Sequence, residues 1–207
     1  MRAREALARL RAGNERFRAH LAGQRGALAA TVHTRLTVEH KPFAILLGCS
    51  DARVPAEIIF DEWVGDLFVI RVAGNVVAPS VIASVEFSAE AFGTRLVVVM
   101  GHTQCGAVGA TIDAVLHPAT GQPRGVTDIV DRIRPVVEPL VRTNLAGDRD
   151  ALSLRAVRAN VRASANQLRH GSRILEQLAA SDGLVVVGAE YAIETGMVEF
   201  FDGVPQD

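Results

Sequence analysis

The stretch Phe43-Ala44-Ile45-Leu46-Leu47-Gly48 runs directly into Cys49-Ser50-Asp51-Ala52-Arg53, and this junction decides the fold. An apolar run without a charge is typical of a strand buried on both faces, as in a parallel sheet. A second apolar run, residues 96–100, ends in a similar way, in Gly101-His102-Thr103-Gln104-Cys105-Gly106. Reactive side chains therefore follow the ends of two predicted buried strands.

Helical patterns separate these runs, which predicts an α/β fold with a mostly parallel sheet flanked by helices. We expect loops at 23–42 and 117–125, a C-terminal hairpin strand at one edge of the sheet, and four preceding strands near 43–48, 67–72, 95–100 and 184–189. In the strand order 2-1-3-4, the first and third strands are neighbours where the order reverses. Sheets of this kind bind their ligands at that point.

The chain has 207 residues, enough for one sizeable core, and we predict a single domain over 1–207. Residues 1–22 form an N-terminal arm, whose helix is expected over 2–22 with Ala6, Leu7, Leu10 and Phe17 on its apolar stripe. This helix either packs on its own domain or reaches over a second subunit. The pattern alone leaves both alternatives open.

Composition excludes several classes of protein. The formal net charge of −1 gives no sign of a nucleic-acid or membrane partner, and no apolar run approaches the length of a membrane span. The first residues lead into a charged amphipathic pattern instead of a signal-peptide core. Two cysteines cannot build a disulfide framework. We therefore expect a cytoplasmic protein with reduced thiols.

Cys49, His102 and Cys105 form a candidate metal site. Two thiolates and one imidazole are good zinc ligands, and three protein ligands leave the fourth position for water, as a catalytic zinc requires. This predicts an enzyme that activates water on one Zn²⁺ per chain. An alternative is a nucleophilic cysteine activated by the histidine as general base, but this explains only one of the two thiols. A redox pair is another, although it ignores His102 and lacks the Cys-x-x-Cys spacing.

Asp51 and Arg53 alternate with Cys49 along the chain. They could form an ordinary surface ion pair, which stabilises little. Beside zinc, a carboxylate held by a guanidinium group would instead orient the attacking hydroxide. Asp51 released from Arg53 could itself become the fourth zinc ligand and close the site. Higher pH would then favour the open form, because hydroxide competes better for the metal.

The spacing Cys49-x-Asp51-x-Arg53 with His102-x-x-Cys105-Gly106 resembles that of the β-class carbonic anhydrases. The likeness covers nearly the whole chain, in Gly13-Asn14-x-Arg16-Phe17, Ser50-Asp51-x-Arg53-Val54-Pro55-Ala56-Glu57, Arg71-x-Ala73-Gly74-Asn75, Ser84-Val85-Glu86-Phe87 and Thr195-Gly196-x-Val198-Glu199. The resemblance implies reversible hydration of carbon dioxide to bicarbonate and a proton by zinc-bound hydroxide, with Asp51 and Arg53 as the orienting dyad. It also implies a homodimer, sometimes assembled further to a homotetramer, with the N-terminal helix over the partner.

By the same resemblance, a small apolar substrate pocket lies near the dimer interface and is lined by Phe68, Ala73 and Phe87. The backbone N–H of Gly106 would donate to bound bicarbonate. Many members have tyrosine in place of Phe87 and glutamine in place of His40, so a hydrogen-bonding group is lost at each position. His40 either replaces the lost amide or is an ordinary exposed histidine.

Some members of that family inhibit themselves by binding bicarbonate at a second site made by tryptophan, arginine and tyrosine. Arg71 and Tyr191 match the arginine and the tyrosine, but Leu46 stands at the tryptophan position, and the single tryptophan is Trp63. We therefore expect no such inhibitory site and a zinc site that is mainly open near neutral pH.

Two other functions remain compatible with the residues. A hydrolase on the same scaffold could act on a sulfur analogue of the substrate, carbon disulfide. A zinc-stabilised binding or sensor protein without turnover could use Asp51 to complete a closed four-ligand site. In such a protein Arg53 and the apolar pocket positions would have no evident purpose.

Overall fold

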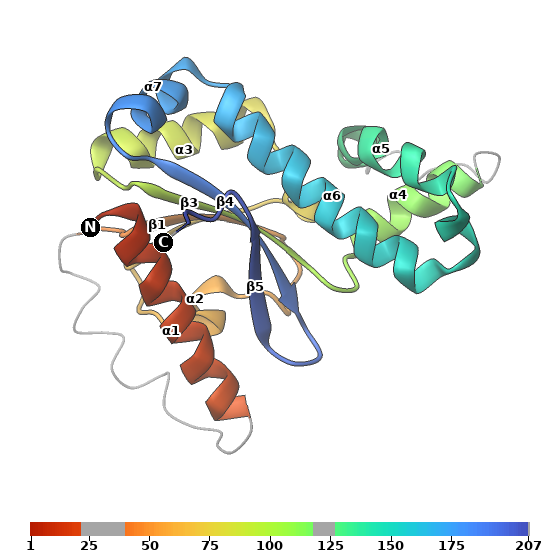
Figure 1. Cartoon of the computed structure of the whole chain (residues 1–207), viewed down its shortest axis with the longest axis horizontal. Coiled ribbons are helices and arrows are strands. Elements are labelled where there is room, and N and C mark those ends of the chain that lie inside the picture. The colour runs from red at the N-terminus through yellow and green to blue at the C-terminus, as the bar shows by residue number, and fades with distance from the viewer. Residues whose placement is uncertain (22–39, 118–126, 207) are drawn as a thin grey trace.

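The computed structural model describes residues 1–21, 40–117 and 127–206. Most of the two predicted loops, 23–42 and 117–125, lies outside these residues. The elements follow one another as strands alternating with helices (Figure 1), in the order α1 (Ala3–Leu21), β1 (Ala44–Gly48), α2 (Ala56–Ile59), β2 (Leu67–Arg71), η1 (Ala73–Asn75), α3 (Pro79–Ala91), β3 (Leu96–His102), α4 (Gly106–Leu116), α5 (Thr127–Val141), η4 (Asn144–Gly147), α6 (Arg149–His170), α7 (Arg173–Ser181), β4 (Val185–Ala192) and β5 (Met197–Asp202).

The strands form one sheet in the order β2-β1-β3-β4-β5, which confirms the predicted order and the hairpin strand at the edge. β1, β2, β3 and β4 pair in parallel, and β5 pairs antiparallel to β4. β3 is longer than predicted and continues to His102, because Gly101 and His102 still pair with Glu190 and Tyr191 of β4. The second metal-site segment is therefore anchored in the sheet up to its histidine.

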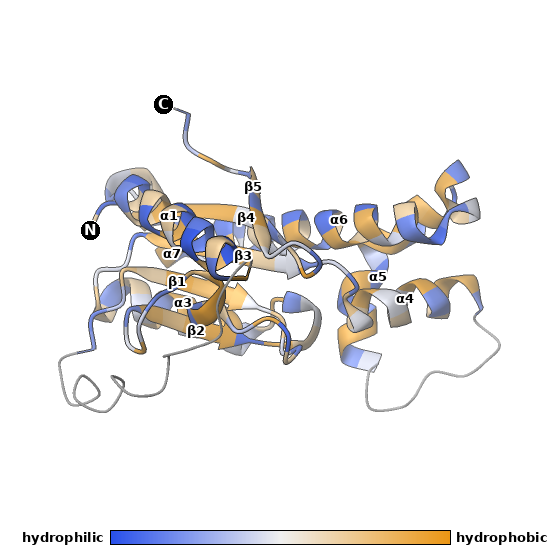
Figure 2. Ribbon diagram, turned by 90° about the horizontal axis from the view of Figure 1, so that it is seen from below, coloured by the Kyte–Doolittle hydropathy of each residue, from blue (hydrophilic) through white to orange (hydrophobic). Residues whose placement is uncertain are grey.

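Helices cover both faces of the sheet (Figures 1 and 2). Leu46 and Val98 point into the core under α1 and α2, whereas their chain neighbours Leu47 and Val99 point into the core under α3, α6 and α7. This alternation follows from the two-residue period of a strand. Because both faces are buried, the central strands are continuous apolar runs, as the sequence indicated.

A third apolar cluster lies at the carboxyl end of the sheet, among α4, α5 and the first half of α6. It contains Ile112, Ile133 and Leu152, and both cysteines, Cys49 and Cys105, belong to it. Figure 1 shows α4 and α5 beyond the strand ends. The candidate metal site is thus backed by packed helices on this side.

Helix α1 packs on the chain's own sheet. Ala6, Leu7 and Leu10 are buried in the same core as Leu46. Contact of this helix with a second subunit stays a prediction. Among the described helices, none combines the length and the apolar character needed to cross a membrane.

Candidate metal centre

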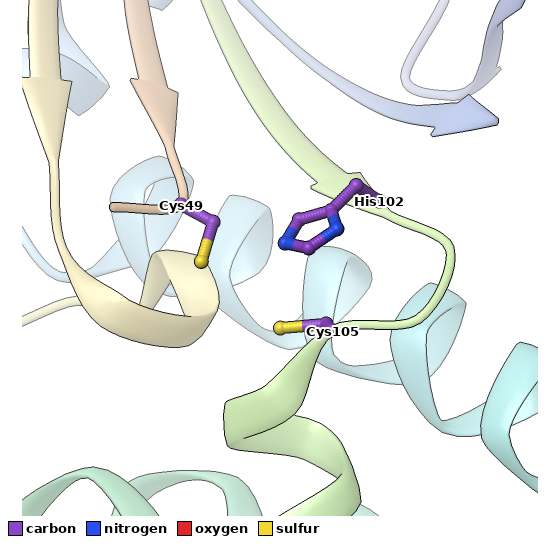
Figure 3. Close-up of side chains that lie close together, drawn as sticks. All are labelled: Cys49, His102 and Cys105. Atoms are coloured by element: carbon purple, nitrogen blue, oxygen red, sulfur yellow. The ribbon is translucent and has the colours of Figure 1, made fainter. Parts of the chain in front are cut away.

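Two loops meet at the carboxyl ends of neighbouring strands. β1 and β3 are parallel, with Gly48 opposite Met100, so the residues that follow them emerge at one edge of the sheet. Cys49 comes directly after β1, His102 ends β3, and Cys105 is the residue before α4. Their candidate ligand atoms all lie within 4.8 Å of one another, and Figure 3 shows the two sulfurs and the imidazole pointing toward one point.

The imidazole of His102 has one nitrogen engaged and one nitrogen free. Nδ1 lies 2.8 Å from the carbonyl oxygen of Thr103, so Nδ1 carries the proton and donates it to that oxygen. Nε2 is buried and has no hydrogen-bond partner within the described residues. A buried, unpartnered nitrogen is costly unless something binds it. The fixed tautomer leaves the Nε2 lone pair available to a metal.

The two cysteines are buried and form no disulfide. Gly74 donates its amide to Cys49 Sγ over 3.3 Å. Hydrogen bonding from the Cys105 thiol lowers the pKa of Cys49, and the amide of Gly74 lowers it further. The pKa of Cys105 is raised, because it donates that bond and because it is buried. Two sulfurs and one imidazole nitrogen in this arrangement fit zinc, which prefers this donor set.

Asp51 and Arg53 form a two-pronged ion pair beside the sulfurs. Arg53 Nε donates to Asp51 Oδ1 at 3.0 Å and Nη2 to Oδ2 at 2.8 Å, and the backbone amide of Arg53 adds a bond of 2.9 Å to Oδ1. These bonds hold the pKa of Asp51 well below its usual range. Its carboxylate is therefore ionised at neutral pH and engaged at both oxygens.

Arg71 has a role here that the sequence did not indicate. Its Nε donates to the carbonyl oxygen of Cys49 at 3.0 Å, and its Nη2 donates to that of Asp51 at 2.5 Å. One guanidinium group thus fixes the backbone on which both a candidate ligand and the candidate orienting carboxylate stand.

Gly74 is a further residue whose role was missed. It has φ +65°, and a Cβ atom there would lie 2.8 Å from Ile133 Cδ1. Only glycine combines this left-handed conformation with so close an approach. The signal in the sequence was the glycine after Ala73, but nothing near it showed that its amide reaches a sulfur.

The predicted pocket residues are divided between two places. Gly106 begins α4 next to Cys105, where the first amide groups of a helix have no acceptor within the helix. Ala73 is exposed and lies one residue before Gly74, whose amide contacts Cys49. The remaining candidates lie away from the centre.

Phe68, Phe87 and His40 belong to an aromatic cluster with Phe92 at the β2 edge of the sheet. Phe68 contacts the other three, with ring centroids 6.2 to 6.3 Å apart, and Phe87 is 56% exposed. Phe68 pairs with Ile45, four residues before Cys49, which is roughly 13 Å along a strand. The chain therefore does not bring these aromatic side chains to its own metal centre.

Leu46 and Tyr191, the positions considered for an inhibitory site, are both buried in the core. Trp63 is 38% exposed in the turn before β2. Arg71 is engaged with the backbone of the Cys49 loop. These placements agree with the expectation that a tryptophan-arginine-tyrosine site is absent, which stays a prediction.

The sequence of this chain is similar to those of known carbonic anhydrases. A family model described as carbonic anhydrase matches residues 44–198. Carbonic anhydrase 2 of Mycobacterium tuberculosis is 35% identical over 94% of this chain and 91% of its own length, and a carbonic anhydrase of Mycolicibacterium smegmatis is 36% identical over 92% and 89%.

Solved structures agree with these relatives. The β-carbonic anhydrase CafA of Aspergillus fumigatus has a TM-score of 0.73 at 26% identity and covers 83% of this chain and 80% of its own. The Coccomyxa β-carbonic anhydrase, solved with acetazolamide, has a TM-score of 0.69 at 25% identity, with 91% and 82% covered.

Proposed function

This chain belongs to the β-class carbonic anhydrase family, and on that premise we propose that it hydrates carbon dioxide reversibly to bicarbonate and a proton at one zinc ion held by Cys49, His102 and Cys105. The observation that carries the proposal is the free Nε2 of His102, buried within 4.8 Å of two thiol sulfurs. Zinc at this point would act as a Lewis acid and lower the pKa of water toward neutrality.

The chain's own residues would supply orientation. Asp51 accepts a hydrogen bond from the attacking water, so that a lone pair points at the carbon of the substrate. Arg53 holds Asp51 in place, and its two bonds of 2.8 and 3.0 Å favour an arrangement in which Asp51 stays off the metal and the fourth position is open. The amide of Gly106 is available to an oxygen of the product.

The aromatic cluster His40–Phe68–Phe87–Phe92 would line a pocket only if a second copy contributes it. No described strand pairs with the outer edge of β2, and Phe87 is largely exposed beside it. We propose that two copies associate through this region, so that the apolar pocket of each site includes residues of the partner, and that the N-terminal helix extends this contact. Sordaria macrospora has tetrameric β-carbonic anhydrases of the same fold, which supports further assembly.

Two alternatives receive less support. Each relative named above is a carbonic anhydrase, which favours carbon dioxide over carbon disulfide. A non-catalytic zinc protein would leave the engaged Asp51–Arg53 pair without a purpose.

A cytoplasmic location agrees with the two free thiols.

Stopped-flow hydration of carbon dioxide with a pH indicator, on protein with its zinc content assayed, tests the proposal at about pH 7 and about pH 8.5. We expect fast hydration at both values. Activity only at the higher pH would show that Asp51 closes the site near neutrality. No hydration by protein that holds one zinc per chain would refute the proposed reaction.

A further inference from the structure

The two residues between His102 and Cys105 are held by the turn that joins β4 to β5. Thr103 donates its amide to the carbonyl oxygen of Tyr191 at 3.0 Å, and its hydroxyl oxygen accepts the amide of Ile193 at 3.0 Å. The same hydroxyl donates to Oε2 of Glu194 at 2.9 Å. Gln104 donates from Nε2 to Oε1 of Glu194 at 2.6 Å. One carboxylate therefore binds both linker residues.

Gln104 also contacts Arg53 of the proposed catalytic pair, Asp51 and Arg53. Its Oε1 lies 3.4 Å from Nη1 of Arg53, and its backbone oxygen lies 3.4 Å from Nη2. Glu194 accepts a hydrogen bond from the side-chain NH₂ group of Gln104. The side-chain oxygen of Gln104 is therefore left to face the guanidinium group of Arg53, where it accepts from a charged donor. Glu194 therefore adds a second constraint to that of Arg53 itself on which end of the amide faces the guanidinium group.

The turn that carries Glu194 is itself supported by α1. Asn14 donates from Nδ2 to the carbonyl oxygen of Gly196 at 2.9 Å and accepts the amide of Val198 at 2.9 Å. Gly196 has φ +71°, and a Cβ atom there would lie 3.2 Å from the ring of Phe17. The helix thus fixes the turn through Asn14 and Phe17.

We propose that Glu194 is a positioning residue for the reaction. It fixes the side chain of Gln104, Gln104 fixes the guanidinium group of Arg53, and Arg53 fixes the carboxylate of Asp51. This inference rests on the proposed function. The simpler alternative is that Glu194 only braces the turn, in which case its loss would change stability or zinc retention and leave Arg53 where it is.

A double-mutant cycle separates these alternatives. The variants are Glu194→Ala, Gln104→Ala and the double variant, each assayed for kcat, KM, zinc content and thermal unfolding. We expect each single change to lower kcat about tenfold, as for residues that orient a catalytic group, with KM and zinc content unchanged. The double variant should lose no more than the worse single variant, because both changes break the same connection.

A second readout does not depend on turnover. The Nε–H of Arg53 gives an NMR signal that Arg53→Lys would assign, and we expect its exchange with water to be several-fold faster in Glu194→Ala than in the wild type. Thr195→Ala is the matched control: it lies in the same turn, and within the described part of the chain its hydroxyl accepts only the nearby amide of Met197, at 3.3 Å. It should keep the wild-type kcat and exchange rate.

Three results would overturn the inference. They are a wild-type kcat in Glu194→Ala, losses that multiply in the double variant, or loss of zinc together with activity. If the wild-type protein does not hydrate carbon dioxide, the proposed function fails, and the exchange rate of Arg53 still decides whether Glu194 fixes that side chain.

Discussion

The two loops that meet at the metal centre are held in different ways. The loop after β1 is held by charges close to it: Arg53 binds the carboxylate of Asp51 two residues away, and Arg71, at the end of the adjacent strand, binds two of its carbonyl oxygens. The loop after β3 is held by residues about 90 positions later, through Thr103 and Gln104.

The supports of the two loops differ in how exposed they are. In the Cys49 loop, one ion pair decides whether Asp51 is held or released, and that pair lies at the surface, with the side chain of Arg53 47% exposed. In the other loop, backbone hydrogen bonds to Tyr191 and Ile193 leave little freedom. If Asp51 is released from its ion pair, we therefore expect this to happen in the first loop without movement of the second.

The largest effect should come from removing one thiol from either loop. Cys49→Ser and Cys105→Ser should each lose zinc and lower hydration about a thousandfold or more, because water without the metal keeps its high pKa. Metal analysis and stopped-flow rates measure this. If one variant kept one zinc per chain, the cysteine changed in it would not be a required zinc ligand.

A change at Asp51 tests whether the first loop carries the chemistry. Asp51→Asn should keep its zinc and lower kcat by about 10²–10³, because an amide cannot take the orienting role of the carboxylate. The matched control is Asp61→Asn, which alters another aspartate–arginine pair, with Arg16, away from the site. Equal losses in both variants would contradict a special role for Asp51.

Removing Arg71 tests how the first loop is anchored. Arg71→Met should weaken zinc retention about ten- to a hundredfold, since the carbonyl oxygens of Cys49 and Asp51 lose their donor. Competition with a chelator measures this. Arg95→Met is the control, because Arg95 also binds a carbonyl oxygen, that of Ala89, but just before β3, at the opposite end of that strand from the metal centre. Unchanged retention in Arg71→Met would refute the anchoring role.

The smallest effects on activity should come from replacing the glycine near each loop, Gly74 or Gly106, with alanine. Gly74→Ala should lower the free energy of unfolding by about 1–2 kcal/mol for its left-handed conformation alone, with more from the contact with Ile133. Gly106→Ala meets no described atom within 4 Å, so stability should hold while kcat/KM falls a few-fold, because the methyl group enters the space next to Cys105. Urea unfolding measures the stability of both variants, and steady-state kinetics measures their kcat/KM. A stable Gly74→Ala together with an unstable Gly106→Ala would contradict the roles given to these two glycines.

The convergence of Cys49, His102 and Cys105 could be predicted because it depends on strand order and on where parallel strands end. The Asp51–Arg53 pair could be predicted because the two residues are only two positions apart in the sequence. The order of the sheet was itself assumed, because alternating strands and helices limit the possible topologies without selecting one, and the structure confirms the assumed order.

The supports of the site could not be predicted. Glu194 contacts Gln104 across 90 positions, and Asn14 contacts Val198 across 184, and no local pattern marks such pairs. The helix η1 was missed because it depends on left-handed backbone at Gly74 and Asn75, which no periodic pattern in the sequence marks. The aromatic cluster is a different case: the family resemblance assigned Phe68 and Phe87 to a substrate pocket near a dimer interface, and their part in such a pocket stays a prediction.

The contact between Asn14 and the β4–β5 turn has a consequence for synthesis on the ribosome. The three candidate zinc ligands are all made within the first 105 positions, yet the groups that fix the second loop arrive only with residues 191–198. Contacts of such long sequence separation form late and slowly. The nascent chain can therefore present its thiols to metal long before it can hold the catalytic geometry, and maturation of the enzyme waits for its last strands.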